Sequence, residues 1–261
     1  MTAPFVDRPT VPRRRRPFNP ENRTAAAEAG CDTPLVRTYG QYCPVARTAE
    51  LFAERWTPII IRNLLGGVTT FGQLQAGAPG IPKAVLSDRL AVLGRAGIVE
   101  RRLHPARRVT YHLTDSGRDL KPLCDAMGAW GMRWLEVEPR HVDPAYVLWA
   151  TARLVDTDTL PPRQVTVRVE LRDVSTAHYW LLLRRPTAEV CTHYPGTPED
   201  LVLYTDADAL ARWHLRERTY AELVRQQRIR VDGPRDLARA FPGWIRPSPH
   251  AVHRIPAAPA G

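Results

Sequence analysis

Basic side chains that can bind phosphate groups are concentrated in the middle of this 261-residue chain. Residues 43–135 hold 13 Lys and Arg against 7 Asp and Glu, which is most of the net charge of +10. Arg101, Arg102, Arg107 and Arg108 lie close together there, and a guanidinium group matches the geometry of a phosphate. This charge predicts a polyanionic partner, nucleic acid before membrane, although heavy arginine use can equally reflect base-rich codon usage.

Short motifs that carry catalysis or bind metal ions are missing from the sequence. The four cysteines form no Cys-x-x-Cys pair, which argues against disulfides or a zinc site: Cys31, Cys43, Cys124 and Cys191. His178, His193 and His214 are too widely separated for a short metal motif, and no Gly-x-Ser-x-Gly or phosphate-binding glycine loop occurs. We therefore predict a protein that is not an enzyme and that uses no metal or other cofactor.

The apolar pattern predicts short helices that position some of the basic residues. One stripe runs through residues 49–56, a second helix follows Pro58, a third covers residues 71–75, and a fourth opens at Pro82. In the fourth helix, Leu86, Leu90 and Leu93 share a face that must be buried. The other side and the first turn present small or polar groups that fit into a groove: Lys83, Ala84, Ser87 and Asp88.

A hairpin is predicted directly after these helices. Residues 98–103 and 109–113 have the period-two pattern of strands, and the tip between them is basic. Three helices followed by a hairpin is the order of a winged helix-turn-helix, in which one helix lies in the major groove of DNA. The hairpin arginines then lie where a wing meets the phosphate backbone.

A long helix capped by Thr114 is predicted next. Five apolar residues recur along it at spacings of three and four: Leu120, Leu123, Met127, Trp130 and Trp134. The helix either packs on its own domain or pairs with a second copy, and two bulky tryptophans favour a homodimer. Such a dimer would place two reading helices about one turn of DNA apart.

Six sequence fragments in register resemble the HxlR-type bacterial transcription regulators. They are CPV at 43–45, RWT at 55–57, FGQL at 71–74, LSDRL at 86–90, GIVER at 97–101 and YHLTDSG at 111–117. The resemblance implies a dimeric winged helix protein that binds operator DNA. One departure is Pro82, where family members usually have a serine, so the reading helix loses a side-chain cap.

The resemblance assigns Lys83, Ser87 and Arg89 to the reading helix, and Arg107 and Arg108 to the wing. Lys83 and Ser87 are expected to contact the groove or phosphates, whereas Arg89 contacts DNA or pairs with a carboxylate inside the domain. Several members of the family also have a cysteine just before the first helix that senses oxidants or electrophiles. Cys43 has this position, with Arg47 one turn on, so it is either a reactive thiol or a small buried apolar residue.

The second half is predicted to be an α+β domain with an antiparallel meander. A helix at 144–154 precedes strand-like runs at 164–171, 178–184, 189–193 and 201–204, and helices follow, with one last strand at 229–231. A capping pair, Thr205 and Asp208, is expected to open the first of those helices. The order and an Ile-x-Val-x-Gly signature resemble sterol-carrier-like domains, which implies an apolar ligand pocket. The candidate lining residues, which are otherwise simply core, are Trp180, Leu182, Trp213, Tyr220 and Trp244.

These predictions divide the chain into four parts. A basic, proline-rich flexible arm covers residues 1–38, the winged helix domain 39–139, the sterol-carrier-like sensing or accessory domain 140–246, and a flexible tail 247–261. No signal sequence or membrane span is predicted, so the expected location is the cytoplasm. The expected function is a homodimeric, DNA-binding transcription regulator that responds to a hydrophobic small molecule or to oxidation of Cys43. The alternatives are a carrier of a lipid-like molecule with secondary DNA binding, and a second half that only mediates dimerisation.

Overall fold

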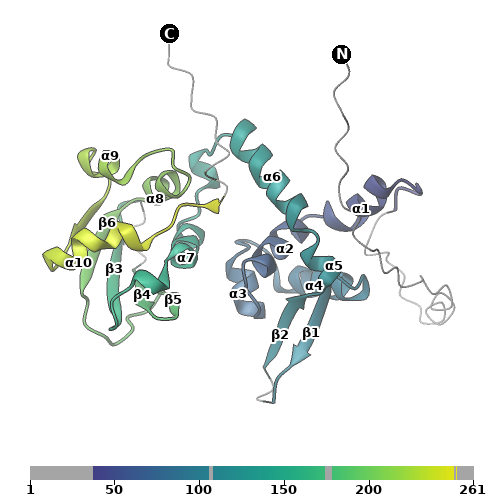
Figure 1. Ribbon diagram of the computed structural model, residues 1–261, viewed down its shortest axis with the longest axis horizontal. Helices are drawn as coiled ribbons and strands as arrows, with labels where there is room; N and C mark the ends of the chain where they lie inside the picture. The colour runs from purple at the N-terminus through teal and green to yellow at the C-terminus, as the bar shows by residue number, and fades with distance from the viewer. Residues whose placement is uncertain (1–37, 106–107, 174–177, 250, 252–261) are drawn as a thin grey trace, which may run out of the picture. The chain divides into compact units, whose positions relative to one another are not determined.

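The structure is a computed structural model that describes residues 38–105, 108–173, 178–249 and 251 (Figure 1). The predicted N-terminal arm lies outside the described residues except for Thr38. Arg107 in the predicted wing and most of the predicted tail also lie outside them. None of the helices in the described ranges is long and apolar enough to cross a membrane.

Four short helices open the described chain. They are α1 (Pro44–Phe52), α2 (Thr57–Leu65), α3 (Phe71–Ala76) and α4 (Lys83–Arg95). The first helix ends at Phe52, earlier than its apolar stripe predicted, and Trp56, with a left-handed φ of 77°, is the N-cap of α2. Pro58 sits in the first turn of α2, where its missing N–H costs no hydrogen bond. Two glycines, Gly66 and Gly67, follow the end of α2 as predicted.

Helices α3 and α4 form a helix-turn-helix. Thr70 and Gln73 make a reciprocal capping box that fixes the start of α3. Pro82 precedes α4 and provides no side-chain cap, as its residue type requires. Gly97, at φ +70°, adopts the left-handed conformation just beyond α4 and directs the chain into the first strand.

The predicted hairpin is present, and two helices rather than one follow it. Strands β1 (Val99–Leu103) and β2 (Val109–Leu113) pair antiparallel, with α5 (Asp115–Arg118) and α6 (Lys121–Trp134) after them. Thr114 caps only the four-residue α5, because Pro122 starts a new helix. Gly117 is required in α5, since a Cβ there would lie 2.3 Å from the Ile98 carbonyl oxygen.

One hydrophobic core holds these elements together. Its fully buried members include Ile60 and Ile61 from α2, Leu74 from α3, and Leu86 and Leu93 from α4. This confirms the predicted buried face of α4 and leaves the other face of that helix in solvent.

The second half contains a mixed sheet with helices and short 3₁₀ turns. Its helices are α7 (Pro144–Leu154), α8 (Ala207–His214), α9 (Tyr220–Arg225) and α10 (Arg235–Ala240). Its strands are β3 (Val165–Leu171), β4 (Tyr179–Arg184), β5 (Thr187–Cys191), β6 (Leu201–Thr205) and β7 (Arg230–Asp232). The 3₁₀ turns are η2 (Pro139–His141), η3 (Thr157–Thr159) and η4 (Phe241–Trp244).

The predicted antiparallel meander is wrong for one pairing. The strand order is β5-β4-β3-β6-β7, and β6 lies parallel to β3 instead of beside β5 (Figure 1). Asp200 secures this pairing, because its backbone N–H donates to the Thr166 carbonyl and its carboxylate accepts from the Thr166 N–H at 2.9 Å. The domain is therefore α+β with a mixed sheet.

Only one face of this sheet belongs to the main core. Alternate residues such as Val167, Leu181 and Leu203 pack there with Leu148 of α7 and Phe241 of η4.

Helix α8 is capped by Asp206, whose carboxylate accepts from the Ala209 N–H at 2.7 Å, and not by the predicted pair Thr205 and Asp208.

Burial of His214 is expected to make this domain sensitive to acid. Burial lowers the pKa of His214 from 6.5 to about 4, so between these pH values the unfolded chain binds more protons. The free energy of unfolding should therefore fall by about 2 kcal/mol between pH 7 and pH 5 through this residue. Urea unfolding at both pH values checks this against His214→Gln, which lacks the titrating group. Equal pH dependence in the two proteins would contradict it.

Candidate nucleic-acid interface

The groove-facing residues predicted on α4 lie together on its exposed side. Lys83, Ala84, Ser87 and Asp88 are all exposed, while Leu86 and Leu90 on the other side of the helix are buried. The first turn of α4 contains no acidic residue. This surface offers one positive charge, one hydroxyl, one small side chain and the negative charge of Asp88 to an approaching duplex.

The sequence proximity of the hairpin arginines suggested one cluster, but Arg101 and Arg102 lie on opposite faces of the hairpin. Arg101 pairs across the hairpin with Tyr111, and Arg102 with Thr110, so the two arginines point to opposite faces. Arg102 also forms an ion pair with Glu100. Arg108 is exposed next to the tip and has no ion-pair partner among the described residues. The hairpin therefore offers positive charge on both faces and at its end.

Arg89 is directed into its own domain. Its Nη2 donates to Oε2 of Glu54 at 2.8 Å, and the two side chains are 18% and 28% exposed. Glu54 lies in the turn between α1 and α2, so the pair ties α4 to that turn. Glu54 was missed from the sequence, because 35 residues separate the partners and no local pattern relates them.

A mutant cycle is expected to show that Arg89 has a structural role. Arg89→Gln and Glu54→Gln should each lower the free energy of unfolding by about 1 kcal/mol, and the double variant by no more than either. Urea unfolding of the four proteins measures this. If Arg89→Gln alone reduced the salt dependence of DNA binding while Glu54→Gln left it unchanged, Arg89 would instead be a phosphate contact.

Helix α6 presents the predicted seam to solvent. Met127, Trp130 and Trp134 are 49%, 58% and 63% exposed, and Leu123 on the same face is 36% exposed. Leu120, the fifth predicted member of the seam, packs instead against the hydrophobic core that α2, α3 and α4 share. A soluble domain rarely leaves two tryptophans and a methionine of one face uncovered.

Cys43 occupies the N-cap position of α1 and is partly exposed. The backbone N–H groups of Ala46 and Val45, at the start of α1, lower the pKa of its thiol. Burial instead raises the pKa of Cys124 and Cys191. Arg47 does not assist the thiol directly, because its guanidinium pairs with Glu50 at 2.5 Å.

The five predicted ligand-pocket residues do not line one cavity. Trp180 donates its indole N–H to Glu199 and, with Leu182, lies on the sheet face away from the main core. Trp244 is buried in that core on the other face. Only Trp213 and Tyr220 line a common cavity, of about 450 Å³. Strand alternation places neighbouring side chains on opposite faces, so no pocket joins all five.

Comparison with known proteins is consistent with the geometry of the first domain. Residues 51–139 match the HxlR-like helix-turn-helix family. The HTH-type transcriptional regulator sll1512 of Synechocystis is 36% identical over 117 residues, which are 44% of this chain and 85% of that protein. YvaP of Bacillus subtilis is 31% identical over 106 residues, which are 40% and 96%.

A solved structure described as the redox regulator HypR in its oxidized form is also similar. It has 31% identity and a TM-score of 0.33, over 34% of this chain and 94% of that one. The helix-turn-helix and the relatives define a protein of the HTH-type transcriptional-regulator class. The chain belongs to the HxlR-like helix-turn-helix family. The residues that match the family end at 139, before α7.

Proposed function

We propose that the protein is a transcription regulator that binds operator DNA as a homodimer. The observation that carries this is the exposed face of α4, followed by a basic hairpin, on a domain of the HxlR-like family. Helix α4 enters the major groove, and the hairpin contacts the adjacent phosphates. The excess of positive charge in residues 43–135 supplies the attraction that does not depend on sequence.

Individual roles follow from side-chain chemistry. Lys83 contacts a phosphate or the groove edge, Ser87 donates to either, and Ala84 allows close approach. Asp88 would repel phosphates unless it accepts from a cytosine amino group. The wing contacts come from arginines, of which Arg107 lies outside the described residues: Arg101, Arg102, Arg107 and Arg108.

The direct test is binding of the full chain to DNA from the upstream region of its own gene across a salt series. An unrelated duplex of equal length is the control. We expect the upstream DNA to bind at least 100-fold more tightly at physiological salt. Equal, weak and steeply salt-dependent binding of both duplexes would show only a basic surface, and would favour the carrier function.

We also propose that Cys43 modulates this activity through oxidation. We expect iodoacetamide at pH 7 to alkylate Cys43 at least 10-fold faster than Cys124 or Cys191, because backbone N–H groups at the start of α1 lower its pKa whereas burial raises the pKa of the other two thiols. Peptide mapping by mass spectrometry over time measures the three rates. Equal rates at the three sites would contradict a special role for Cys43.

The second domain is proposed to sense a small molecule, in line with its resemblance to sterol-carrier-like domains. Its own hydrophobic cluster supports a role beyond DNA binding. Thermal unfolding of the full chain with a fatty acid distinguishes the alternatives, since a module that only mediates dimerisation gives no shift in midpoint.

A further inference from the structure

The cavity beside Trp213 and Tyr220 is lined by arginines as well as aromatic rings, and a site for a purely apolar ligand would not need these charges. It has a volume of about 450 Å³, within the range of small-molecule sites, and lies in the second domain. Its lining is formed by the end of α8, the loop to α9, and the segment that follows η4. Three arginines contribute to this lining, and no acidic residue does: Arg216, Arg218 and Arg246.

Two aromatic rings form the apolar part of the cavity. The ring centroids of Trp213 and Tyr220 are 5.2 Å apart, with planes inclined by 50°. Both side chains are partly buried and pack against the domain core, so the rings are held in place. A planar ring can stack on such a surface with little loss of side-chain freedom.

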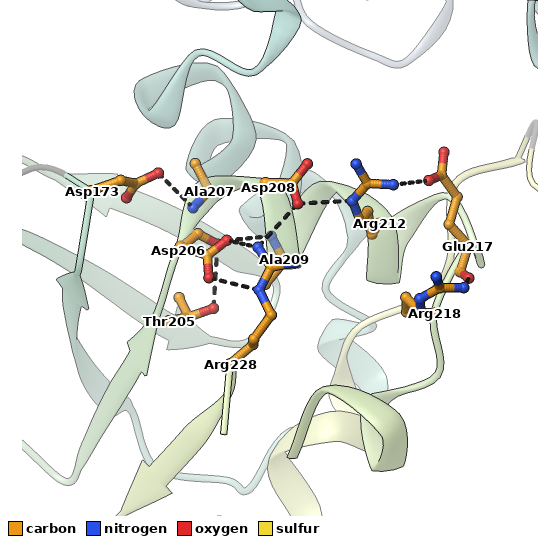
Figure 2. Close-up of polar contacts among 10 residues, drawn as sticks. All are labelled: Asp173, Thr205, Asp206, Ala207, Asp208, Ala209, Arg212, Glu217, Arg218 and Arg228. Atoms are coloured by element: carbon orange, nitrogen blue, oxygen red, sulfur yellow. Dashed lines mark hydrogen bonds and ion pairs between the residues drawn. The ribbon is translucent and has the colours of Figure 1, made fainter. Parts of the chain in front are cut away.

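Acidic groups near the cavity are engaged elsewhere or are too few to neutralise it. Glu217 lies within the arginine-bearing loop, but its carboxylate accepts from Arg212 Nη1 at 2.8 Å and its side chain is only 6% exposed (Figure 2). Arg218 donates to the backbone carbonyl of Glu217, and its charge also helps to lower the pKa of Glu222, which neutralises part of that charge. Asp156 pairs with Arg246 and cancels one of the three charges.

An ion-pair network fixes the helix that carries this loop. Arg228 bridges Asp206 and Asp208 at the start of α8, and Arg212 joins Asp208 to Glu217 at its end (Figure 2). Because both ends of α8 are tied, Arg216 and Arg218 are presented from a supported loop. Arg216 forms no ion pair with any described residue, so its guanidinium can bind an anion from solution.

We propose that this cavity binds a small planar aromatic molecule that carries one anionic group. The ring stacks on Trp213 and Tyr220, and the carboxylate, sulfonate or phosphate pairs with Arg216 and Arg218. Tyr220 is a further donor through its phenol, and burial raises its pKa so that it stays neutral. The proposal rests on the sensing role proposed for the second domain and names the class of small molecule that this domain binds.

Isothermal titration of the full chain with 2-naphthoate tests the charge requirement. We expect one site per chain, and at least 10-fold weaker binding of the neutral 2-naphthamide. Cyclohexanecarboxylate, which has the charge without the aromatic ring, should also bind at least 10-fold more weakly. Equal binding of the amide, or no binding of 2-naphthoate at millimolar concentration, would overturn the proposal.

Variants then test the location, because a chain with a net charge of +10 can attract anions at many places. Arg216→Gln/Arg218→Gln should weaken 2-naphthoate at least 10-fold, as should Tyr220→Leu. Arg225→Gln/Arg239→Gln is the matched control, since both arginines are exposed on α9 and α10 outside the cavity. Unchanged binding by the Arg216/Arg218 variant, or equal weakening by the control, would overturn the assignment. Circular dichroism of each variant establishes that its fold is intact.

Discussion

Lys83→Ala/Arg108→Ala should weaken binding of operator DNA by roughly 100- to 1,000-fold. Lys83 lies in the first turn of α4 and Arg108 beside the hairpin tip, and both are exposed. Neither forms an ion pair with a described residue, so each charge is available to a phosphate. In a homodimer the two substitutions remove four contacts. The slope of log K against log salt should therefore become shallower by about 3.6.

Fluorescence anisotropy of a labelled duplex across a salt series gives both quantities. Arg225→Ala/Arg239→Ala is the control, because it removes the same charge from exposed positions of the second domain. It should leave the slope unchanged. The proposed interface would be wrong if Lys83→Ala/Arg108→Ala also left the slope of the unsubstituted protein unchanged.

Trp130→Ala/Trp134→Ala should convert the dimer to a monomer, with at least a 100-fold increase in the dimer dissociation constant. Both tryptophans are more than half exposed in the single chain, so truncating them costs little folding stability. In a symmetric interface each residue acts twice, and buried tryptophans dominate such interfaces energetically. Loss of the dimer also removes simultaneous binding of two half-sites, so operator affinity should fall as well.

Sedimentation velocity over a range of concentrations measures this equilibrium. Tyr194→Ala is the matched control, because Tyr194 is a similarly exposed aromatic residue, at 61%, outside α6. It should leave the dimer intact. An unsubstituted protein that is monomeric at all concentrations, or a tryptophan variant that remains dimeric, would contradict the proposed interface.

Local signals were sufficient for much of the first domain. The buried face of α4 follows from the spacing of Leu86, Leu90 and Leu93, and the hairpin from period-two alternation. The division between α5 and α6 could also have been predicted from Pro122, since proline rarely occurs inside a helix. That division was missed because the apolar spacing continues through it. The left-handed turn at Trp56 had no such signal, because left-handed conformations favour glycine.

By itself, the sequence determined the helix-turn-helix, the hairpin and the shared apolar face of α6, because these depend on patterns among residues close along the chain. Only the tertiary structure decided the parallel pairing of β3 with β6, the pairing of Arg89 with Glu54, and the separation of Trp180 from Trp244. Each of these depends on which distant segments meet, and periodicity shows which residues share a face without showing what covers it. For the same reason, the arginines around Trp213 and Tyr220 became recognisable as one site only after the chain had folded.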